Sequence, residues 1–503
     1  MRIRLLAQLW FLLLVNLKGS LGSTVQDDHP DLVKSIPGYP GPPPSKWYSG
    51  YLDYTIEGWS IHTHYILIEA EFDEDGDKPL IYWSNGGPGA SSMYGLMTEL
   101  GPLLFSDESL RTHEYRETGI PTPIYNEFSW TKLGSLLLFD APAPVGFSYC
   151  DGPSDVPIGK SCGSWTDERA SLNTYTALQA FYDKFPSYQS KDLFLTGESY
   201  AGIYIPNLAK RIVEGDNEVL KSQLQGFAVG DGCVGTDTKI CAAMFEENSF
   251  YNTLFLAGHH QIPLKTFQDI LTHCGGSEGT TRDSAQCNAT VELAQTQAGG
   301  FYQYSLYDDC TYENGLAATV RGGLNDYPCG GGNVMGEYLN ISAVAEAFHV
   351  TGTTFYITDD AEGFDYTMTE PSVEPFYQSV NGKLRVLVYN GDTDPRINSF
   401  DAQNWTSHLG FEVEQDWTPW TTDGCLRMGG YVTRYAGGFD FLTVRGAGHM
   451  VPTYKPEATF AFLKAWIEST DYPAFRAGCK APEPLRTSGK KTWSRDTNNL
   501  RQG

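Results

Sequence analysis

The chain has 503 residues, a hydrophobic content of 41% and a formal net charge of −26 at pH 7, from 35 Lys and Arg against 61 Asp and Glu. This length allows two domains or one large domain with an insertion, and the apolar content is enough for a substantial core. The negative charge argues against nucleic acid and anionic membranes as partners, and it suits solubility in an acidic compartment.

The first residues have the layout of a secretory signal. Arg2 and Arg4 precede an apolar stretch over residues 5–17, and small residues follow at 19–23. We therefore expect residues 1–22 to be a signal peptide that is excluded from the fold. The apolar stretch is short for a membrane span and nothing else in the sequence is long enough, so no membrane anchor is expected. The expected destination is the secretory pathway, ending outside the cell or in a vacuole or lysosome.

The cysteines point to the same compartment. Ten are present, and an even number behind a signal peptide predicts up to five disulfides, whose connectivity the sequence leaves open. No Cys-x-x-Cys pair occurs, which argues against a zinc or redox site. Asn288, Asn340 and Asn404 each begin an Asn-x-Ser/Thr acceptor and are predicted glycosylation sites.

The first part of the chain places a glycine-rich loop directly after a strand. Residues 29–47 form a Pro- and Gly-rich lead-in, and paired strands are expected near 51–54 and 62–71. The apolar run 80–83 then enters Ser84-Asn85-Gly86-Gly87-Pro88-Gly89. Such a loop brings backbone N–H groups close to a ligand, although it lacks the Gly-Lys-Ser/Thr ending of a phosphate loop. A purely structural turn is the alternative.

The stretch from Leu193 to Gly202 predicts a strand, a sharp turn and a helix. The apolar run ends in Gly197-Glu198-Ser199-Tyr200-Ala201-Gly202, and apolar residues continue at helical spacing to Val213. A Ser between small residues at such a turn is typical of a nucleophile elbow, here with Ala in place of the second Gly. Pro206 is an objection to the helix because it removes one backbone hydrogen bond. Taken alone, the pattern also fits an ordinary exposed Ser.

The composition changes after Gly232. Residues 233–375 hold six of the ten Cys, two of the three glycosylation acceptors and helical patterns such as 264–271, and they predict a cap inserted into the core. The two parts of that core are then residues 23–232 and 376–485. A helix over 456–467 is expected to close it. The polar residues 486–503 are expected to be a disordered tail.

Polar residues follow four of the expected buried strands: Asn85 to Gly87, Ser199, Asp394 and His449. Loops at the carboxyl ends of parallel strands meet at one edge of a sheet. The chain order Ser, Asp, His is that of the α/β-hydrolase elbow enzymes. The sequence therefore predicts an α/β-hydrolase fold, with a mostly parallel central sheet flanked by helices and a largely helical, disulfide-containing cap insertion.

These residues predict a serine hydrolase. A Ser hydroxyl needs a base within hydrogen-bond reach, which would be His449 acting on Ser199. Asp394 would hold the His tautomer and stabilise the imidazolium. Asp392 competes for this place, and Asp394 is preferred because hydrolase loops often read Gly-x-x-Asp there. A core histidine is the alternative for His449.

The oxyanion of a tetrahedral intermediate needs preorganised donors. The residue after the nucleophile supplies one, the Tyr200 N–H. The glycine loop is expected to supply the other, from Gly87.

The chain resembles the serine carboxypeptidase family. The matching stretches run in order along most of it, at residues 48–51, 83–89, 99–102, 140–149, 197–202, 391–394 and 446–452. The resemblance implies release of single residues from peptide C-termini. It further implies that the terminal carboxylate is bound by Asn85 and the Gly86 backbone, together with Glu99 and Glu198. Two such carboxyls facing a third would share protons and act as donors, which favours an acid-working enzyme.

The resemblance also places Tyr94 and Met450 near the leaving-group side of the site, although both could be core residues. The sequence departs from the family pattern at two positions. Ala90 lies where many members have a Cys, so the disulfide that ties down this loop is expected to be missing. Asp231 lies where Asn is usual.

Other functions remain open. Relatives with the same triad transfer acyl groups from glucose esters to alcohols, but such donors have no peptide carboxylate, so Asn85, Glu99 and Glu198 favour a peptidase. A binding or protective protein with a residual fold is a further alternative, against which the intact triad argues. No metal and no cofactor are expected, because the His pairs at 62/64 and 259/260 lack Glu-x-x-His spacing. The expected partners are peptide or protein C-termini, and the protein is expected to be a monomer or homodimer.

Overall fold

The computed structural model describes residues 29–152, 162–241, 249–274, 284–310, 325, 327–357 and 363–480. The predicted signal peptide and the predicted tail lie outside the described residues. Within those ranges, no helix has both the length and the apolar character needed to cross a membrane.

The strands of the described chain include short pairs as well as the strands of the main sheet. They are β1 (Leu32–Val33), β2 (Trp47–Ile56), β3 (Trp59–Ile68), β4 (Leu80–Ser84), β5 (Leu103–Leu104), β6 (Ile124–Tyr125), β7 (Ser135–Phe139), β8 (Tyr149–Asp151), β9 (Trp165–Thr166), β10 (Leu193–Glu198), β11 (Leu224–Gly230), β12 (Tyr366–Thr367), β13 (Arg385–Gly391), β14 (Val413–Thr421), β15 (Met428–Tyr435) and β16 (Phe439–Val444).

The helices are of three kinds. The α-helices are α1 (Met93–Gly95), α2 (His113–Thr118), α3 (Asp167–Lys184), α4 (Ala201–Glu214), α5 (Glu218–Gln223), α6 (Ser249–Gly258), α7 (Leu264–His273), α8 (Ala285–Ala298), α9 (Gly331–Leu339), α10 (Ser342–Ala347), α11 (Glu374–Val380), α12 (Ser399–Ser407), α13 (Val451–Tyr454) and α14 (Pro456–Ile467). A π-helical turn, η1 (Leu96–Leu100), follows α1, and 3₁₀ turns are η2 (Asp107–Leu110), η3 (Trp130–Lys132) and η4 (Pro186–Ser190).

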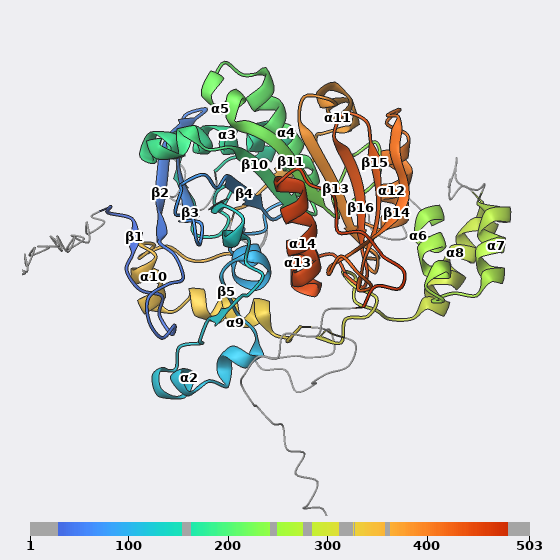
Figure 1. Cartoon of the computed structure of the whole chain (residues 1–503), viewed down its shortest axis with the longest axis horizontal. Coiled ribbons are helices and arrows are strands. Elements are labelled where there is room, and N and C mark those ends of the chain that lie inside the picture. Colours follow the sequence, from blue (N-terminus) through green and yellow to red (C-terminus); the bar gives the residue numbers. More distant parts are fainter. Residues whose placement is uncertain are drawn as a thin grey trace, which may run out of the picture.

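One mixed sheet organises the molecule (Figure 1). Its strand order is β1-β2-β3-β7-β4-β10-β11-β13-β16-β15-β14, with β8 added to β3. The six strands from β7 to β16 are parallel, and the strands on either side of them are antiparallel. The predicted α/β-hydrolase fold is confirmed, and its parallel part is the centre of the sheet.

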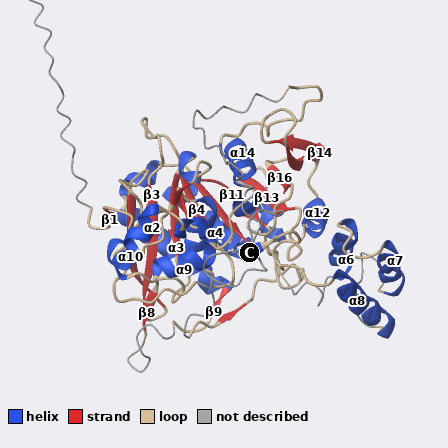
Figure 2. Ribbon diagram, turned by 90° about the horizontal axis from the view of Figure 1, so that it is seen from below, coloured by secondary structure: helices blue, strands red, loops and turns tan. Residues whose placement is uncertain are grey.

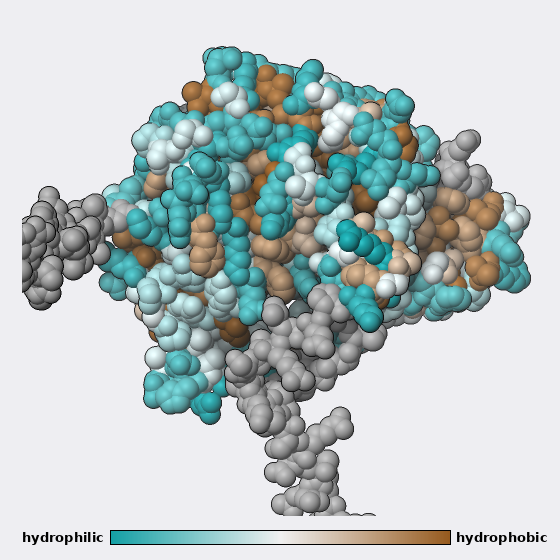
Figure 3. Space-filling view, viewed as in Figure 1, coloured by the Kyte–Doolittle hydropathy of each residue, from teal (hydrophilic) through white to brown (hydrophobic). Residues whose placement is uncertain are grey.

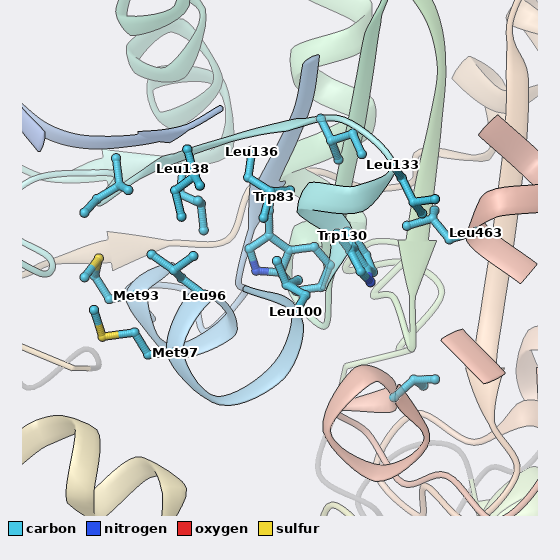
Figure 4. Packing of buried hydrophobic residues seen from close by; sticks show 14 of the residues in the cluster. Trp83, Met93, Leu96, Met97, Leu100, Trp130, Leu133, Leu136, Leu138 and Leu463 are labelled. Atoms are coloured by element: carbon cyan, nitrogen blue, oxygen red, sulfur yellow. The ribbon is translucent and has the colours of Figure 1, made fainter. Parts of the chain in front are cut away.

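The central strands are apolar on both sides because helices cover both faces. Along β4, Ile81 and Trp83 point into one core, while Leu80 and Tyr82 point into the other. Helices α9, α10, α13 and α14 pack on the first face with α1 and η1, and α3, α4, α11 and α12 pack on the second. Figure 4 shows the first core, where the Trp83 and Trp130 rings meet edge to face at 5.2 Å between centroids.

The chain between β11 and β13 contributes helices to two separate parts of the structure. Helices α6, α7 and α8 pack on one another and extend from the side of the sheet (Figures 1 and 2). In contrast, α9 and α10 bury Tyr338, Leu339 and Val344 in the main core. The face in Figure 3 is largely hydrophilic, with hydrophobic residues in small groups, some of them on the α6–α8 unit.

The disulfides agree with the number predicted from the cysteine count. They are Cys150–Cys162, Cys233–Cys241, Cys274–Cys287, Cys310–Cys329 and Cys425–Cys479. None of them reaches the glycine loop after β4. Of the predicted glycosylation sites, Asn340 is exposed, and Asn288 and Asn404 are half-buried on α8 and α12.

Candidate active site

The carboxyl ends of the parallel strands bring the predicted residues together. The glycine loop follows β4, Ser199 follows β10, Asp394 lies three residues after β13, and His449 lies five residues after β16. Because β4, β10, β11, β13 and β16 are neighbours in parallel register, these loops lie along one edge of the sheet.

Ser199 occupies the strained turn of an elbow. Its φ of 62° lies in the left-handed region, which is costly for a residue with a Cβ and is typical of functional sites. The turn is held by hydrogen bonds: the Ser199 N–H donates to the Gly230 carbonyl at 2.9 Å, and the N–H of Cys233 donates to the Ser199 carbonyl at 3.0 Å. A Cβ on Gly197 would lie 2.6 Å from the Ser84 carbonyl oxygen, so only glycine fits there.

The glycine loop presses directly on this elbow. A Cβ on Gly86 would lie 2.3 Å from the Tyr200 backbone nitrogen and 2.8 Å from the Ser199 Cβ. Gly87 has a φ of 112°, which glycine alone adopts readily. The loop backbone and the Tyr200 N–H at the start of α4 therefore lie side by side next to Ser199.

His449 and Asp394 form a buried pair. The Nδ1 atom of His449 lies 2.7 Å from Oδ2 of Asp394, and their side chains are 4% and 0% exposed. Asp394 also accepts from the N–H groups of Arg396 at 2.7 Å and Ile397 at 3.3 Å. Asp392, the competing residue, instead accepts from the Gly446 N–H at 2.6 Å. Of the two carboxylates, Asp394 is thus the one that contacts the imidazole.

Tyr304 is a site residue that the sequence did not reveal. Its ring lies 4.9 Å from the His449 ring between centroids, and its carbonyl accepts from the His449 N–H at 2.8 Å. It comes from the expected cap, between α8 and α9, where no motif marked it. Only the packing of the cap against the core places it beside the imidazole.

Asn85 joins the two glutamates. Its Nδ2 donates to Oε1 of Glu198 at 2.9 Å and to Oε1 of Glu99 at 3.2 Å. Its Oδ1 accepts from the Trp83 Nε1–H and the Gly95 N–H, both at 2.9 Å, so the orientation of the amide is fixed. Both glutamates are buried, at 1% exposure for Glu99 and 4% for Glu198.

Burial favours the protonated forms of the two carboxyls. Burial raises the pKa of Glu99 to about 7, against the lowering effect of hydrogen bonds from Asn85 and Glu198. Burial and then the charge of Glu99 raise the pKa of Glu198 well above its usual range. A shared proton within the pair is therefore favoured over two charged carboxylates. Neither Oε2 atom has a hydrogen bond from another described group.

A cavity of about 730 Å³ lies beside α1, η1 and the loop that follows His449. Tyr94 and Met450, the two predicted pocket residues, both line it, together with Thr98, Tyr302, Tyr327 and Tyr454. Tyr94 lies on α1, one turn before Glu99, and Met450 directly follows His449. The cavity is thus lined by sequence neighbours of Glu99 and His449, and not by Glu99, Glu198 or His449 themselves.

A second Ser–His–Asp chain is present in the β2–β3 region. Ser49 Oγ lies 3.0 Å from His64 Nε2, and His64 Nδ1 lies 2.7 Å from Asp140 Oδ2. The three residues are at most 2% exposed, and the Ser49 hydroxyl donates to the Phe348 carbonyl at 2.7 Å. Because this hydroxyl faces a carbonyl inside the core, the chain of hydrogen bonds is structural.

Comparisons with known proteins agree with this geometry. A serine carboxypeptidase from Caenorhabditis elegans is 31% identical, with 88% of this chain and 94% of that protein covered. The lysosomal protective protein of Mus musculus is 30% identical over the same shares, and serine carboxypeptidase 1 of Hordeum vulgare is 27% identical over 86% and 92%.

The fold has a solved counterpart in a prohormone-processing carboxypeptidase of Saccharomyces cerevisiae. The TM-score is 0.60 at 20% identity, covering 84% of this chain and 92% of that one. The family model described as serine carboxypeptidase matches residues 37–469. This match spans the strands from β2 to β16, the elbow and the His449 loop, and the chain therefore belongs to the serine carboxypeptidase family of hydrolases.

Proposed function

We propose that this carboxypeptidase releases C-terminal residues from peptides at acidic pH through an acyl-enzyme on Ser199. The observation that carries the proposal is the buried group of Asn85, Glu99 and Glu198 beside the elbow. A protonated carboxyl pair with a fixed amide can bind a substrate carboxylate, whereas an ordinary ester or amide substrate offers no anion to these donors.

The triad roles follow from the contacts. Ser199 Oγ attacks the scissile carbonyl while His449 accepts its proton, and His449 then protonates the leaving amine. The bond to Asp394 keeps the Nδ1 position protonated and leaves Nε2 free for the hydroxyl. The N–H groups of Gly87 and Tyr200 are the proposed oxyanion donors.

The terminal carboxylate would be held on the other side of the scissile bond. Asn85 Nδ2, the Gly86 N–H and the shared proton of Glu99 and Glu198 supply the donors. Tyr94 and Met450 then line the space for the side chain of the departing residue. Peptide or protein C-termini are accordingly the proposed partners.

The pH dependence has a definite sign. Below about pH 7, Glu99 and Glu198 together keep at least one proton and donate to the substrate. As pH rises through this range, the donor is lost and two negative charges face a third. KM for a peptide with a free C-terminus should therefore rise steeply above neutrality, while KM for the same peptide ended by an amide should change little.

Glu198→Gln provides the matched test, because the amide keeps a donor at every pH. We expect this variant to show a much shallower rise in KM between pH 5 and pH 8 with the free-carboxylate peptide, because only Glu99 still titrates in this range. Ser199→Ala should abolish release of free amino acids and serves as the background control. Equal pH dependence for the free and amide-ended peptides would rule out the carboxylate-binding role.

Transfer of acyl groups from glucose esters to alcohols is the competing activity. The triad alone does not separate the two chemistries, because both pass through an acyl-enzyme. The glutamate pair favours the peptidase. A panel of blocked dipeptides and acyl-glucose donors at about pH 5 decides between them by which substrate acylates Ser199.

We further propose that the mature protein acts in the secretory pathway, either outside the cell or in a vacuole or lysosome. Its five disulfides suit an oxidising route, and one relative is named for the lysosome.

A further inference from the structure

Asp231 is a buried carboxyl that neither the proposed triad nor the carboxylate-binding group uses. It directly follows β11, the strand between the Ser199 strand and the Asp394 strand. It is 0% exposed, and its φ of 41° lies in the left-handed region. A strained, fully buried acid at this edge of the sheet is typical of a functional position.

The contacts of Asp231 hold it rigidly against β13. Its Oδ1 accepts from the Asn390 Nδ2 at 3.0 Å, and the Gly391 N–H lies 3.1 Å from both Oδ1 and Oδ2. Its own N–H donates to the Tyr389 carbonyl at 2.8 Å. One carboxylate oxygen each of Asp231 and Asp394 and one ring nitrogen of His449 lie within 4.8 Å of one another.

The groups around Asp231 are almost all acidic. Glu198 faces it from β10, and Tyr389 and Asp394 face it from β13 and the following loop, with His449 beyond them. Among the described residues, no Lys or Arg makes an ion pair with Asp231. Two carboxylates this close in a low-dielectric site repel each other, which disfavours the charged form of Asp231.

Both carboxyls are held by backbone and side-chain donors. Asp394 accepts from the N–H groups of Arg396 and Ile397 and lies against Nδ1 of His449. Burial, and then the charge of Asp394, raise the pKa of Asp231 well above its usual range. The neutral form of Asp231 is thereby favoured, and in this form its O–H is available to Asp394.

We infer that Asp231 is a positioning residue of the proposed triad: its carboxyl O–H donates to Asp394 and holds that carboxylate in place against His449. The inference rests on the proposed triad. Loss of this proton turns a donor into a second negative charge beside Asp394. The carboxylate is then repelled from its position and the imidazole loses its alignment, so the chemical step slows as pH rises.

The test measures the chemical step without the substrate carboxylate. The wild type and Asp231→Asn are compared by kcat on an amide-ended peptide and by the rate at which a fluorophosphonate labels Ser199, both from pH 4 to pH 9. In the wild type, both rates should fall on the alkaline side, with a limb approaching about tenfold per pH unit. Asp231→Asn keeps an N–H donor at every pH, so this limb should disappear.

A control variant assigns the limb. Asp440 is another buried acid with a raised pKa, bonded to Tyr472 away from the site, and Asp440→Asn should keep the wild-type limb. A limb that persists unchanged in Asp231→Asn overturns the inference, as does one that disappears in Asp440→Asn.

A measurement on the wild type covers the case in which Asp231→Asn does not fold. The proton on His449 Nδ1, followed by ¹⁵N-resolved NMR, should change its shift over the same pH range as the limb, since its acceptor Asp394 moves. A constant shift across the limb overturns the inference. Activity or labelling that survives in Ser199→Ala would instead defeat the proposed triad, which keeps the two failures apart.

Discussion

At the scale of single residues, Gly86 is as necessary to the site as the side chains it supports. It brings the loop backbone against the Tyr200 nitrogen, where a Cβ would lie at 2.3 Å. The obstacle is backbone, which cannot rotate away as a flexible side chain would. The position of the proposed oxyanion donors therefore depends on the absence of one methyl group.

Gly86→Ala is accordingly expected to lower kcat by about 10²–10³-fold, the usual effect of losing one oxyanion donor. KM for an amide-ended peptide should change much less, because the methyl group disturbs the transition state more than the bound substrate. Gly336→Ala on α9 is the matched control, since nothing lies within 4 Å of its added Cβ. Wild-type kcat in Gly86→Ala would contradict this account of the loop.

At the scale of elements, strand β4 links the core to the carboxylate-binding group. Trp83 packs its ring on Trp130 in the core, and its Nε1–H donates to Asn85 Oδ1 at 2.9 Å. That bond fixes which end of the Asn85 amide faces the glutamates. The alternation of a buried strand thus sets the orientation of a binding residue two positions later.

Trp83→Phe should separate packing from orientation. The smaller ring keeps most of the apolar contact but removes the donor, so KM for a free-carboxylate peptide should rise several-fold while KM for the amide-ended peptide stays constant. Trp130→Phe makes a comparable cavity without touching Asn85, and it should lower thermal stability without this selective change in KM. The same KM increase with both substrates would indicate general damage to the site.

The elements also show what the sequence could predict. Strands β4, β7, β10, β11, β13 and β16 were predictable because strands buried on both faces are short apolar runs. Strands β14 and β15 gave no such signal, since β14 is largely exposed over its first half and β15 has Gly429 and Gly430 directly after its first residue. Helix α3 is rich in polar residues, so its apolar periodicity is weak. Helix α4 continues through Pro206 because the burial of this helix in the core outweighs the loss of one backbone hydrogen bond.

The same reasoning explains which site residues could be foreseen. Asp394 and His449 follow apolar runs, so the strand rule marks them, and it would have marked Asp231 after β11 equally well. Tyr304 had no such marker, because its place beside His449 depends on how the cap folds back. Contacts between the cap and the core depend on tertiary packing, which periodicity within a segment does not encode.

At the scale of the whole molecule, the buried acids should make stability depend on pH. Folding raises the pKa values of Glu99, Glu198, Asp231, Asp392 and Asp440, in each case chiefly by burial. The folded state therefore binds more protons than the unfolded state over the range between the unfolded and folded values. The free energy of unfolding falls with pH wherever this holds.

For Glu99 the pH range of this effect runs from its ordinary pKa of 4.5 to about 7. Its contribution to the free energy of unfolding is therefore complete below pH 4.5 and lost by pH 7. Tm should therefore decrease between pH 5 and pH 8. Repulsion within a chain of net charge −26 would act in the same direction, but salt screens exposed charges far more than buried ones. The decrease caused by the buried acids should thus persist in about 0.5 M NaCl, where the Debye length is only a few ångströms.

Glu99→Gln combined with Glu198→Gln should make the decrease in Tm shallower at that salt concentration, as followed by calorimetry. An unchanged slope in the double variant would mean that the acid dependence of stability arises outside the proposed site.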